Sequence, residues 1–429
     1  MKPILKTLFP YSIFIFVLSS STFPLLFVQG ASPQCIEGSG ASQELVLLRG
    51  EHVLVLNASE DVNMFSVKYV FPPEYSSQVP ILFEWVNDTT AHIIHYTIDN
   101  DTLSPNKVMN FTLAPMLKNE SVTLHFNYWV LVKNNNYSDL PNDASIPTVN
   151  ELPAEVKPWL ISTEVVEAHN ILIRFRAQQL QGADDNLRDL AFKIAKFTRN
   201  HHYLFFLIQL KLGTFWVQDA ITTLLINGEC PGRSHLGCAL FRANNVPARV
   251  ILVNANYSFW YQMHFMTEYY FPGYGWIPTE THKGITPYEP KHQIILRICS
   301  LEDENDTHTD YIFPKMTGVE HWIWINNTHI YPYYGTATLE KGCRTNMFPE
   351  QNLTVDNQTA DTAFTLTTNI FYLYQHTIGL NLNSENLSHF HNATQYQKDA
   401  IDILHETGNI TGYILQMDNA YAEYQEITS

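Results

Sequence analysis

The chain has 429 residues, enough for two or three domains, and its 45% hydrophobic and 13% aromatic content excludes a largely disordered protein. Lysine and arginine total 25 against 42 aspartates and glutamates, which gives a formal net charge of -17. This acidic balance gives no electrostatic basis for binding nucleic acid or anionic lipid, and it favours solubility outside a cell.

Residues 1–30 have the pattern of a signal peptide. Lys2 and Lys6 precede an apolar stretch over 8–28, and Gly30 followed by Ala31 supplies the small residues of a cleavage site. The stretch approaches the roughly 20 residues that span a bilayer, so an uncleaved membrane anchor is the alternative. We expect a secreted or cell-surface protein that contacts a membrane only if this segment is retained.

Asn-x-Ser/Thr sequons occur along the whole chain and support export, since such asparagines accept N-linked glycans in secreted proteins. The candidate glycosylation sites are Asn57, Asn87, Asn100, Asn110, Asn119, Asn136, Asn256, Asn305, Asn326, Asn352, Asn357, Asn386, Asn392 and Asn409.

Residues 31–150 are expected to form a β-sandwich domain. Apolar and polar residues alternate over 65–71 and 122–132, the period of a half-buried strand, and 45–56 and 91–99 are further strand candidates. Turn-rich pieces separate these strands. The polar, proline-bearing stretch 138–153 ends the domain.

Residues 151–290 change to an α+β pattern. A helix is expected from Leu187, with Asp184 and Asp185 as caps, then a short helix over 219–226. Cys230-Pro231 begins a further helix that stops near 244–245, because proline is favourable in the first helical turn. A strand over 250–253 follows, and two more strands flank the turn 272–275.

Residues 291–429 form a mixed C-terminal region. Strands are expected at 294–298 and 321–325, and helices at 396–406 and 411–427. This region contains no chemical motif, so its role is not predicted.

The five cysteines leave at least one thiol unpaired within the chain. Cys230 and Cys238 are about 12 Å apart along one predicted helix, too far for a disulfide. We expect a Cys299–Cys343 disulfide, although the sequence alone does not establish which cysteines pair.

Cys230 has the setting of a nucleophile. Unpaired backbone N–H groups in the first turn of a helix stabilise a thiolate. An imidazole must reach the sulfur, and a third polar group must orient the imidazole. His264 on a following strand and Glu280 on the strand after it are the candidates for these two roles.

Three short motifs and three single residues form one pattern along the chain: Gly228-Glu229-Cys230, Val246-Pro247-Ala248-Arg249, Pro272-Gly273-Tyr274-Gly275-Trp276, Arg242, His264 and Glu268. This pattern resembles the core of the transglutaminase-like superfamily. The resemblance covers about 165–290. The β-rich front, with Leu152-Pro153 and Lys157-Pro158-Trp159, is similar to secreted archaeal and bacterial members.

The resemblance implies a papain-like fold with Cys230 as nucleophile, His264 as general base and acid, and Glu280 as the orienting group. It implies acyl transfer or hydrolysis at protein or peptide amides through a thioester, and it implies no cofactor. No metal is expected either, because no third ligand joins His201-His202 or His389 and His391 and the sequence has no calcium-loop signature. Trp216 and Gln218 are candidate oxyanion donors. The alternative is a catalytically weak or inactive surface or extracellular interaction protein that retains the fold.

The sequence departs from the superfamily pattern at two places. Glu280 stands where members usually carry Asp, and His264-Phe265-Met266 replaces His-Ala-Trp. A tight turn over 272–275 would also place Thr267, rather than His264, opposite Glu280. The sequence therefore predicts that the pair meets only through a wider connection or obliquely crossing strands.

Overall fold

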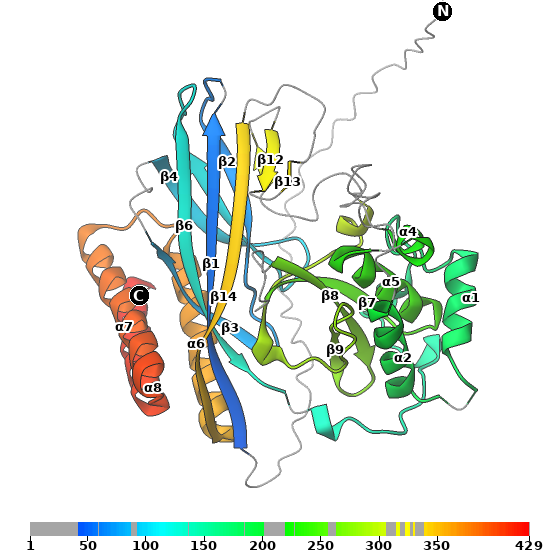
Figure 1. Cartoon of the computed structure of the whole chain (residues 1–429). Helices are drawn as coiled ribbons and strands as arrows, with labels where there is room; N and C mark the ends of the chain where they lie inside the picture. Colours follow the sequence, from blue (N-terminus) through cyan, green and yellow to red (C-terminus); the bar gives the residue numbers. More distant parts are fainter. Residues whose placement is uncertain are drawn as a thin grey trace, which may run out of the picture. The chain divides into compact units, whose positions relative to one another are not determined.

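A computed structural model describes residues 42–58, 60–86, 92–135, 137–183, 185–200, 219–226, 228–255, 263–305, 315–317, 322–326, 329–330 and 339–428, with backbone only for 263, 315–345 and 428. The predicted signal peptide and the candidate oxyanion donors Trp216 and Gln218 lie outside these residues. The chain is α+β, as the sequence predicts (Figure 1).

The larger sheet is built from both ends of the chain, with the order β13-β12-β14-β1-β6-β3. Its strands are β13 (His329–Ile330), β12 (Trp322–Asn326), β14 (Leu339–Asp356), β1 (Ser42–Ala58), β6 (Ser121–Lys133) and β3 (Gln78–Trp85). Strand β1 pairs antiparallel with β6 on one side and with β14 on the other (Figure 1). The C-terminal region therefore completes a sheet that the N-terminal region begins.

The second sheet packs against the first to form the predicted β-sandwich. Its order is β11 (Lys315–Thr317), β2 (Phe65–Phe71), β5 (Lys107–Leu113) and β4 (Ile93–Asn100). Aromatic rings from the two sheets meet between them: Tyr69 and Phe111 of the second sheet lie 5.6 and 5.8 Å from Phe126 of the first. Such ring pairs add to the apolar burial that holds the sheets together.

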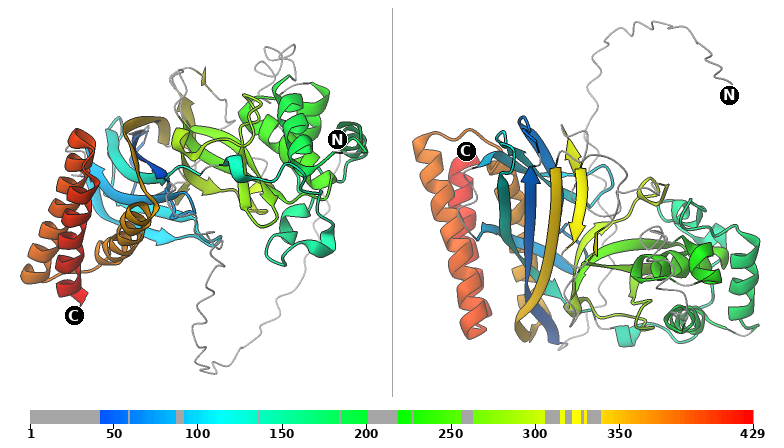
Figure 2. Two further views of the ribbon diagram at one scale, coloured as in Figure 1. Left: turned by 90° about the horizontal axis from the view of Figure 1, so that it is seen from below. Right: turned by 45° about the horizontal axis from the view of Figure 1, so that its top comes forward.

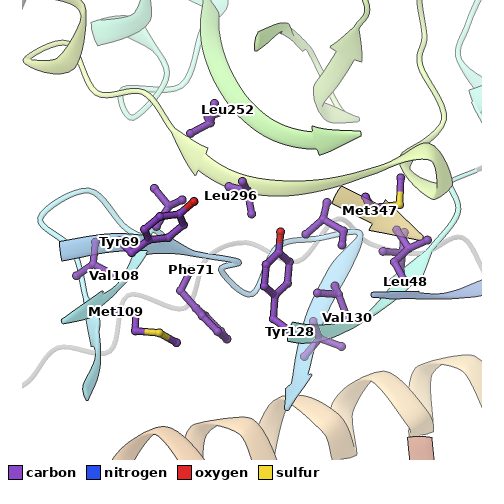
Figure 3. Close-up of a cluster of buried hydrophobic side chains, with 14 of the residues drawn as sticks. Leu48, Tyr69, Phe71, Val108, Met109, Tyr128, Val130, Leu252, Leu296 and Met347 are labelled. Carbon is purple, nitrogen blue, oxygen red and sulfur yellow. The ribbon is translucent and has the colours of Figure 1, made fainter. Parts of the chain in front are cut away.

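Buried residues of the sandwich continue into the part of the chain that carries the candidate site. Tyr69, Tyr128 and Met347 lie near Leu252 and Leu296 in one cluster (Figure 3). Position 50 must be glycine for this packing, since a Cβ there would overlap the Tyr128 ring.

Three C-terminal helices cover the sandwich: α6 (Asn357–Thr377), α7 (Ser384–Thr407) and α8 (Ile410–Thr428) (Figure 2). Phe371 of α6 stacks on Phe71 of β2 with ring centroids 5.6 Å apart. Gln397 of α7 donates a hydrogen bond to the Ile81 carbonyl at 2.7 Å, where β3 bulges. Across the described residues, we find no helix with the length and apolar character that crossing a membrane requires.

Between β6 and β12 lies the mixed region predicted to carry the site. Its helices are α1 (Ile171–Leu180), α2 (Leu187–Arg199), α4 (Ala220–Leu225) and α5 (Cys230–Ala243). Its sheet has the order β10 (Gln293–Ile298), β7 (Ala248–Ala255), β8 (Met263–Phe271) and β9 (Gly275–Thr279). The side chains of α5 are almost all buried, because the helix packs on this sheet and on α1, α2 and α4.

The start of α2 differs from its prediction. Asn186, not Asp185, is the N-cap residue, and its side chain accepts a hydrogen bond from the Asp189 N–H. Asp185 instead accepts from the Gly182 N–H and pairs with Lys193. An aspartate one residue before an asparagine offers two adjacent cap candidates, and local geometry selects between them.

Side-chain amides of the sandwich cover the edge strand β10. Gln78 donates to the Ile295 carbonyl and accepts from the Ile295 N–H, both at 2.8 Å. Asn106 makes the same pair of bonds to Ile298. Each amide mimics a neighbouring strand, so β10 does not present free backbone groups at these positions.

The predicted Cys299–Cys343 disulfide is not present, because Cys299 carries a free thiol in the structure. Cys299 is buried beside β7, where its N–H donates to the Val250 carbonyl, and burial raises the pKa of its thiol well above the ordinary value. The backbone of residue 343 lies in β14, opposite Leu54. Cys299 directly follows β10, whereas residue 343 lies in β14 of a different sheet.

Candidate active site

Cys230 is the first residue of α5, as predicted, and it is half-buried. Glu229 caps the helix in an extended conformation, and Pro231 occupies the first turn. Pro231 has no N–H, and the remaining N–H groups of this turn direct partial positive charge toward the sulfur. Cys238, two turns further on, is fully buried, and burial raises the pKa of its thiol to about 12.

His264 lies on β8, where its neighbour on β7 is Val253. The ring Nε2 is 2.9 Å from Glu280 Oε2, and the ring also hydrogen-bonds the Cys230 side chain. Burial disfavours the charged ring, but the negative charges of Glu280 and of the Cys230 thiolate outweigh burial and raise the pKa of His264 to about 10. A ring with this pKa carries a proton near neutral pH, and it lies between the Glu280 carboxylate and the Cys230 sulfur.

Glu280 is fully buried, and backbone groups orient its carboxylate. Oε1 accepts hydrogen bonds from the N–H groups of His282 at 2.8 Å and Lys283 at 3.4 Å, while Oε2 faces His264. The chain reverses directly after this residue, because the Gly284 and Ile285 N–H groups donate to the Glu280 carbonyl. Gly284 has φ +71°, a conformation that glycine adopts without strain.

The hairpin between β8 and β9 is tight, yet His264 and Glu280 meet. The Tyr274 N–H donates to the Phe271 carbonyl, with Gly273 at φ +80°, and Thr267 pairs with Thr279. The prediction that a tight turn would keep the pair apart is wrong. Continuing this register would place Glu280 opposite Met266, two residues from His264, and a long side chain can reach such a diagonal neighbour. The extra methylene of Glu280 supplies that reach.

Small and hydroxyl-bearing residues hold α5 close to the sheet. A Cβ on Gly237 would lie 2.9 Å from the Thr281 methyl group, so only glycine permits this approach. The Thr267 hydroxyl donates to the Ser234 carbonyl at 3.1 Å, and the Ser234 and Thr281 hydroxyls are 3.2 Å apart. These contacts fix the distance between the helix that carries the thiol and the strands that carry its partners.

The two arginines of the motif, Arg242 and Arg249, make structural contacts. Arg242 makes two hydrogen bonds to the Glu304 carboxylate, at 2.7 and 2.8 Å, inside the protein. Arg249 pairs with Glu268 and lies over the Trp276 ring, 3.9 Å from its centroid. Neither guanidinium takes part in the contacts of Cys230 or His264 described above.

Sequence reasoning missed the contribution of the residues around this triad. Arg233, Thr281 and His282 all lie within a few residues of Cys230 or Glu280, but none belongs to the motif that locates the site. The available signal was the charge of Arg233 in a helix predicted to pack in the core, because a buried charged side chain must find polar partners.

A thiol at a helix start, an imidazole beside it and a buried carboxylate behind the imidazole are the arrangement of groups that a cysteine nucleophile requires. Residues 174–281 match the family described as the Transglutaminase-like superfamily. The match confirms the resemblance predicted from the motifs over this segment. No curated protein matches the sequence.

Solved structures with similar folds are distant. A protein from Cytophaga hutchinsonii described as a candidate cysteine protease is 13% identical, and the match covers 74% of this chain and 94% of that one with a TM-score of 0.48. A candidate protease from Parabacteroides distasonis is 12% identical, with 53% and 42% covered and a TM-score of 0.22. The periplasmic domain of TgpA from Pseudomonas aeruginosa is also 12% identical, with 53% and 92% covered and a TM-score of 0.17.

Proposed function

We propose that this protein is a secreted cysteine-nucleophile enzyme that acts on protein or peptide amides through a thioester. The observation that carries the proposal is the His264 ring, which bonds the Cys230 side chain and lies 2.9 Å from the buried Glu280 carboxylate. A structural cysteine would not need an imidazolium beside it, and a buried carboxylate behind that ring is the arrangement that keeps it charged.

In the first half-reaction the Cys230 thiolate attacks the amide carbonyl carbon, and the carbonyl π electrons move to oxygen. When the tetrahedral intermediate collapses, the C–N bond breaks and the nitrogen takes the proton from the His264 imidazolium. An amine or ammonia leaves, and the acyl group remains on Cys230 as a thioester. Glu280 stays ionised throughout, and stabilises the imidazolium before the proton moves.

In the second half-reaction His264, now neutral, takes a proton from the acceptor as the acceptor attacks the thioester. Water gives a carboxylic acid, and an amine gives a new amide. Both outcomes use the same triad, so these residues support either hydrolysis or acyl transfer. The acceptor decides between them.

Export and glycosylation form part of the same proposal. The supporting features are the signal-peptide pattern, the sequons, and the position of each sequon asparagine whose side chain is described. Those side chains are all exposed or half-buried: Asn57, Asn100, Asn110, Asn119, Asn305, Asn352, Asn357, Asn386, Asn392 and Asn409. Glycosidase treatment of protein from culture medium, followed by mass measurement, tests both features.

The enzymatic proposal is tested with a mixture of denatured proteins as substrate and a fluorescent primary amine as acceptor. Ammonia release and amine incorporation are measured together for the wild type and for C230A. We expect one or both signals from the wild type and neither from C230A. If C230A gives the wild-type signal, the thiol is not the nucleophile.

The interaction-protein alternative is based on Glu280, Met266 and the dense sequons. Glu280 Oε2 lies 2.9 Å from the His264 ring, and Met266 is packed in a buried apolar cluster with Ile251 and Val253. Neither substitution removes a group that the reaction needs, so the enzyme is the better supported function.

A further inference from the structure

We propose that Arg233 is a positioning residue of the catalytic site, which ties the turn before Cys230 to the end of α2 and so aligns the thiol with His264. The inference rests on the proposed function, because it concerns how the same thiol and imidazole are held. It assigns a role to a buried charged side chain that the mechanism itself does not use.

Arg233 lies one helical turn after Cys230 and is 2% exposed. Its Nε donates a hydrogen bond to the Gly228 carbonyl at 2.9 Å, and its Nη1 donates to the Arg199 carbonyl at 3.2 Å. Gly228 precedes the nucleophile by two residues, and Arg199 is the last residue of α2. One guanidinium therefore fixes the approach of the chain to Cys230 against a neighbouring helix, and its planar fork suits two acceptors at once.

The end of α2 also holds the segment that carries Glu280. The Thr198 hydroxyl donates to the Thr281 carbonyl at 3.1 Å. The turn residue Gly284 packs directly on Arg199, where an added Cβ would meet the Arg199 side chain at 2.8 Å. The same helix end thus contacts the segment before the thiol through Arg233 and the segment that orients the imidazole through Thr198.

Arg233 also carries a permanent charge into the site. His282 lies next to the catalytic imidazole, with its ring centroid 6.1 Å from that of His264. Burial, followed by the charges of Arg233 and His264, lowers the pKa of His282 to about 4. The charged and titratable groups that act on His282 are Arg233, His264, Glu280 and Lys283. His282 is consequently neutral near pH 7, and it does not compete with His264 for the charge of Glu280.

The two contributions are separable by substitution. R233K keeps the positive charge, but a single ammonium does not reproduce the planar fork that serves both carbonyls. R233M removes the charge as well, so the pKa of His282 rises and this ring gains a proton at a higher pH than in the wild type. A protonated His282 then repels the His264 imidazolium.

The experiment measures the rate of iodoacetamide alkylation at Cys230 by mass spectrometry as a function of pH. We expect R233K and R233M to react about tenfold or more slowly than the wild type near neutral pH, because a thiol displaced from its partner loses its activation. The pH at which His282 gains its proton, followed by NMR titration of its ring protons, should rise in R233M alone, because only this variant removes the positive charge.

R242K is the matched control, since Arg242 is an equally buried arginine of α5 that bonds Glu304 and the carbonyls of Ala248 and Ile161. It should lower the melting temperature without slowing alkylation of Cys230 or moving the titration of His282. Wild-type alkylation rates in both Arg233 variants would overturn the positioning role. If R233M does not fold, R233K decides the matter: a wild-type rate there contradicts the role. A wild-type Cys230 no more reactive than Cys238 would instead remove the proposed function itself.

Discussion

Replacing Glu280 tests whether the buried carboxylate creates the reactive imidazolium. E280Q keeps the size of the side chain and removes its charge. The His264–Glu280 bond is 2.9 Å long, charged and buried, with the carboxylate fully enclosed. A hydrogen bond to a charged group contributes about 1.5–3 kcal/mol, which corresponds to roughly a 10- to 150-fold loss in rate if it is needed in the transition state.

Removing the charge of Glu280 should also change the pKa of His264. Burial lowers the pKa of this ring, and the negative charge of Glu280 is the largest influence that raises it. Without that charge the pKa of His264 falls, so the ring loses its proton at a lower pH. NMR titration of the ring protons in wild type and E280Q measures this shift. We expect kcat to fall with little change in KM, since Glu280 is buried behind the imidazole.

E280D gives a graded comparison, because it restores the residue that the superfamily usually carries but shortens the side chain. The Glu280 carboxylate reaches a diagonal neighbour and is held by the N–H groups of His282 and Lys283. Aspartate cannot make all of these contacts from the same backbone position, so we expect about a tenfold loss. If E280Q matches the wild type in kcat and in the pKa of His264, the proposed role of Glu280 is refuted.

Three further predictions concern stability. G237A should lower the free energy of unfolding by about 1–3 kcal/mol and slow catalysis, because the added Cβ would push α5 away from Thr281. Urea denaturation measures the stability, and kcat measures the effect on catalysis. Q397L should cost about 1–3 kcal/mol without changing catalysis, since it leaves the Ile81 carbonyl without that donor. His264 has a raised pKa, so its contribution to stability is complete below about pH 6.5 and is lost as the pH rises through about 10. Urea melts at several pH values should show that loss in the wild type, and H264Q should lack it.

The sequence predicted the positions of Cys230 and His264 well because their determinants are local. Proline after Cys230 starts the helix, and alternating residues place His264 on a strand. The contact between the Glu280 carboxylate and the His264 ring was harder to predict. It depends on the chain leaving the β8–β9 register directly after Thr279, and on a side chain long enough to meet a diagonal neighbour. Strand periodicity contains no information about either property.

The rest of the fold depends on contacts between distant parts of the chain. The sequence did not predict β14, and its partner β1 lies about three hundred residues away, with Ser42 opposite Asp356. Pairing over such a separation is set by tertiary packing rather than by a local pattern. The disulfide prediction failed for a related reason: the number of cysteines limits the pairing but does not tell that Cys299 follows β10 while residue 343 lies in a different sheet.

The central claim is that a thiolate and an imidazolium coexist at the start of α5. Ultraviolet absorbance of the thiolate measures this directly at about pH 6, where an ordinary cysteine thiol is protonated. The wild type should show the absorbance of one thiolate, and C230A and H264A should each lose it, while C238A should retain it. A wild-type spectrum identical to that of C230A at this pH would contradict the ion pair and the chemistry that depends on it.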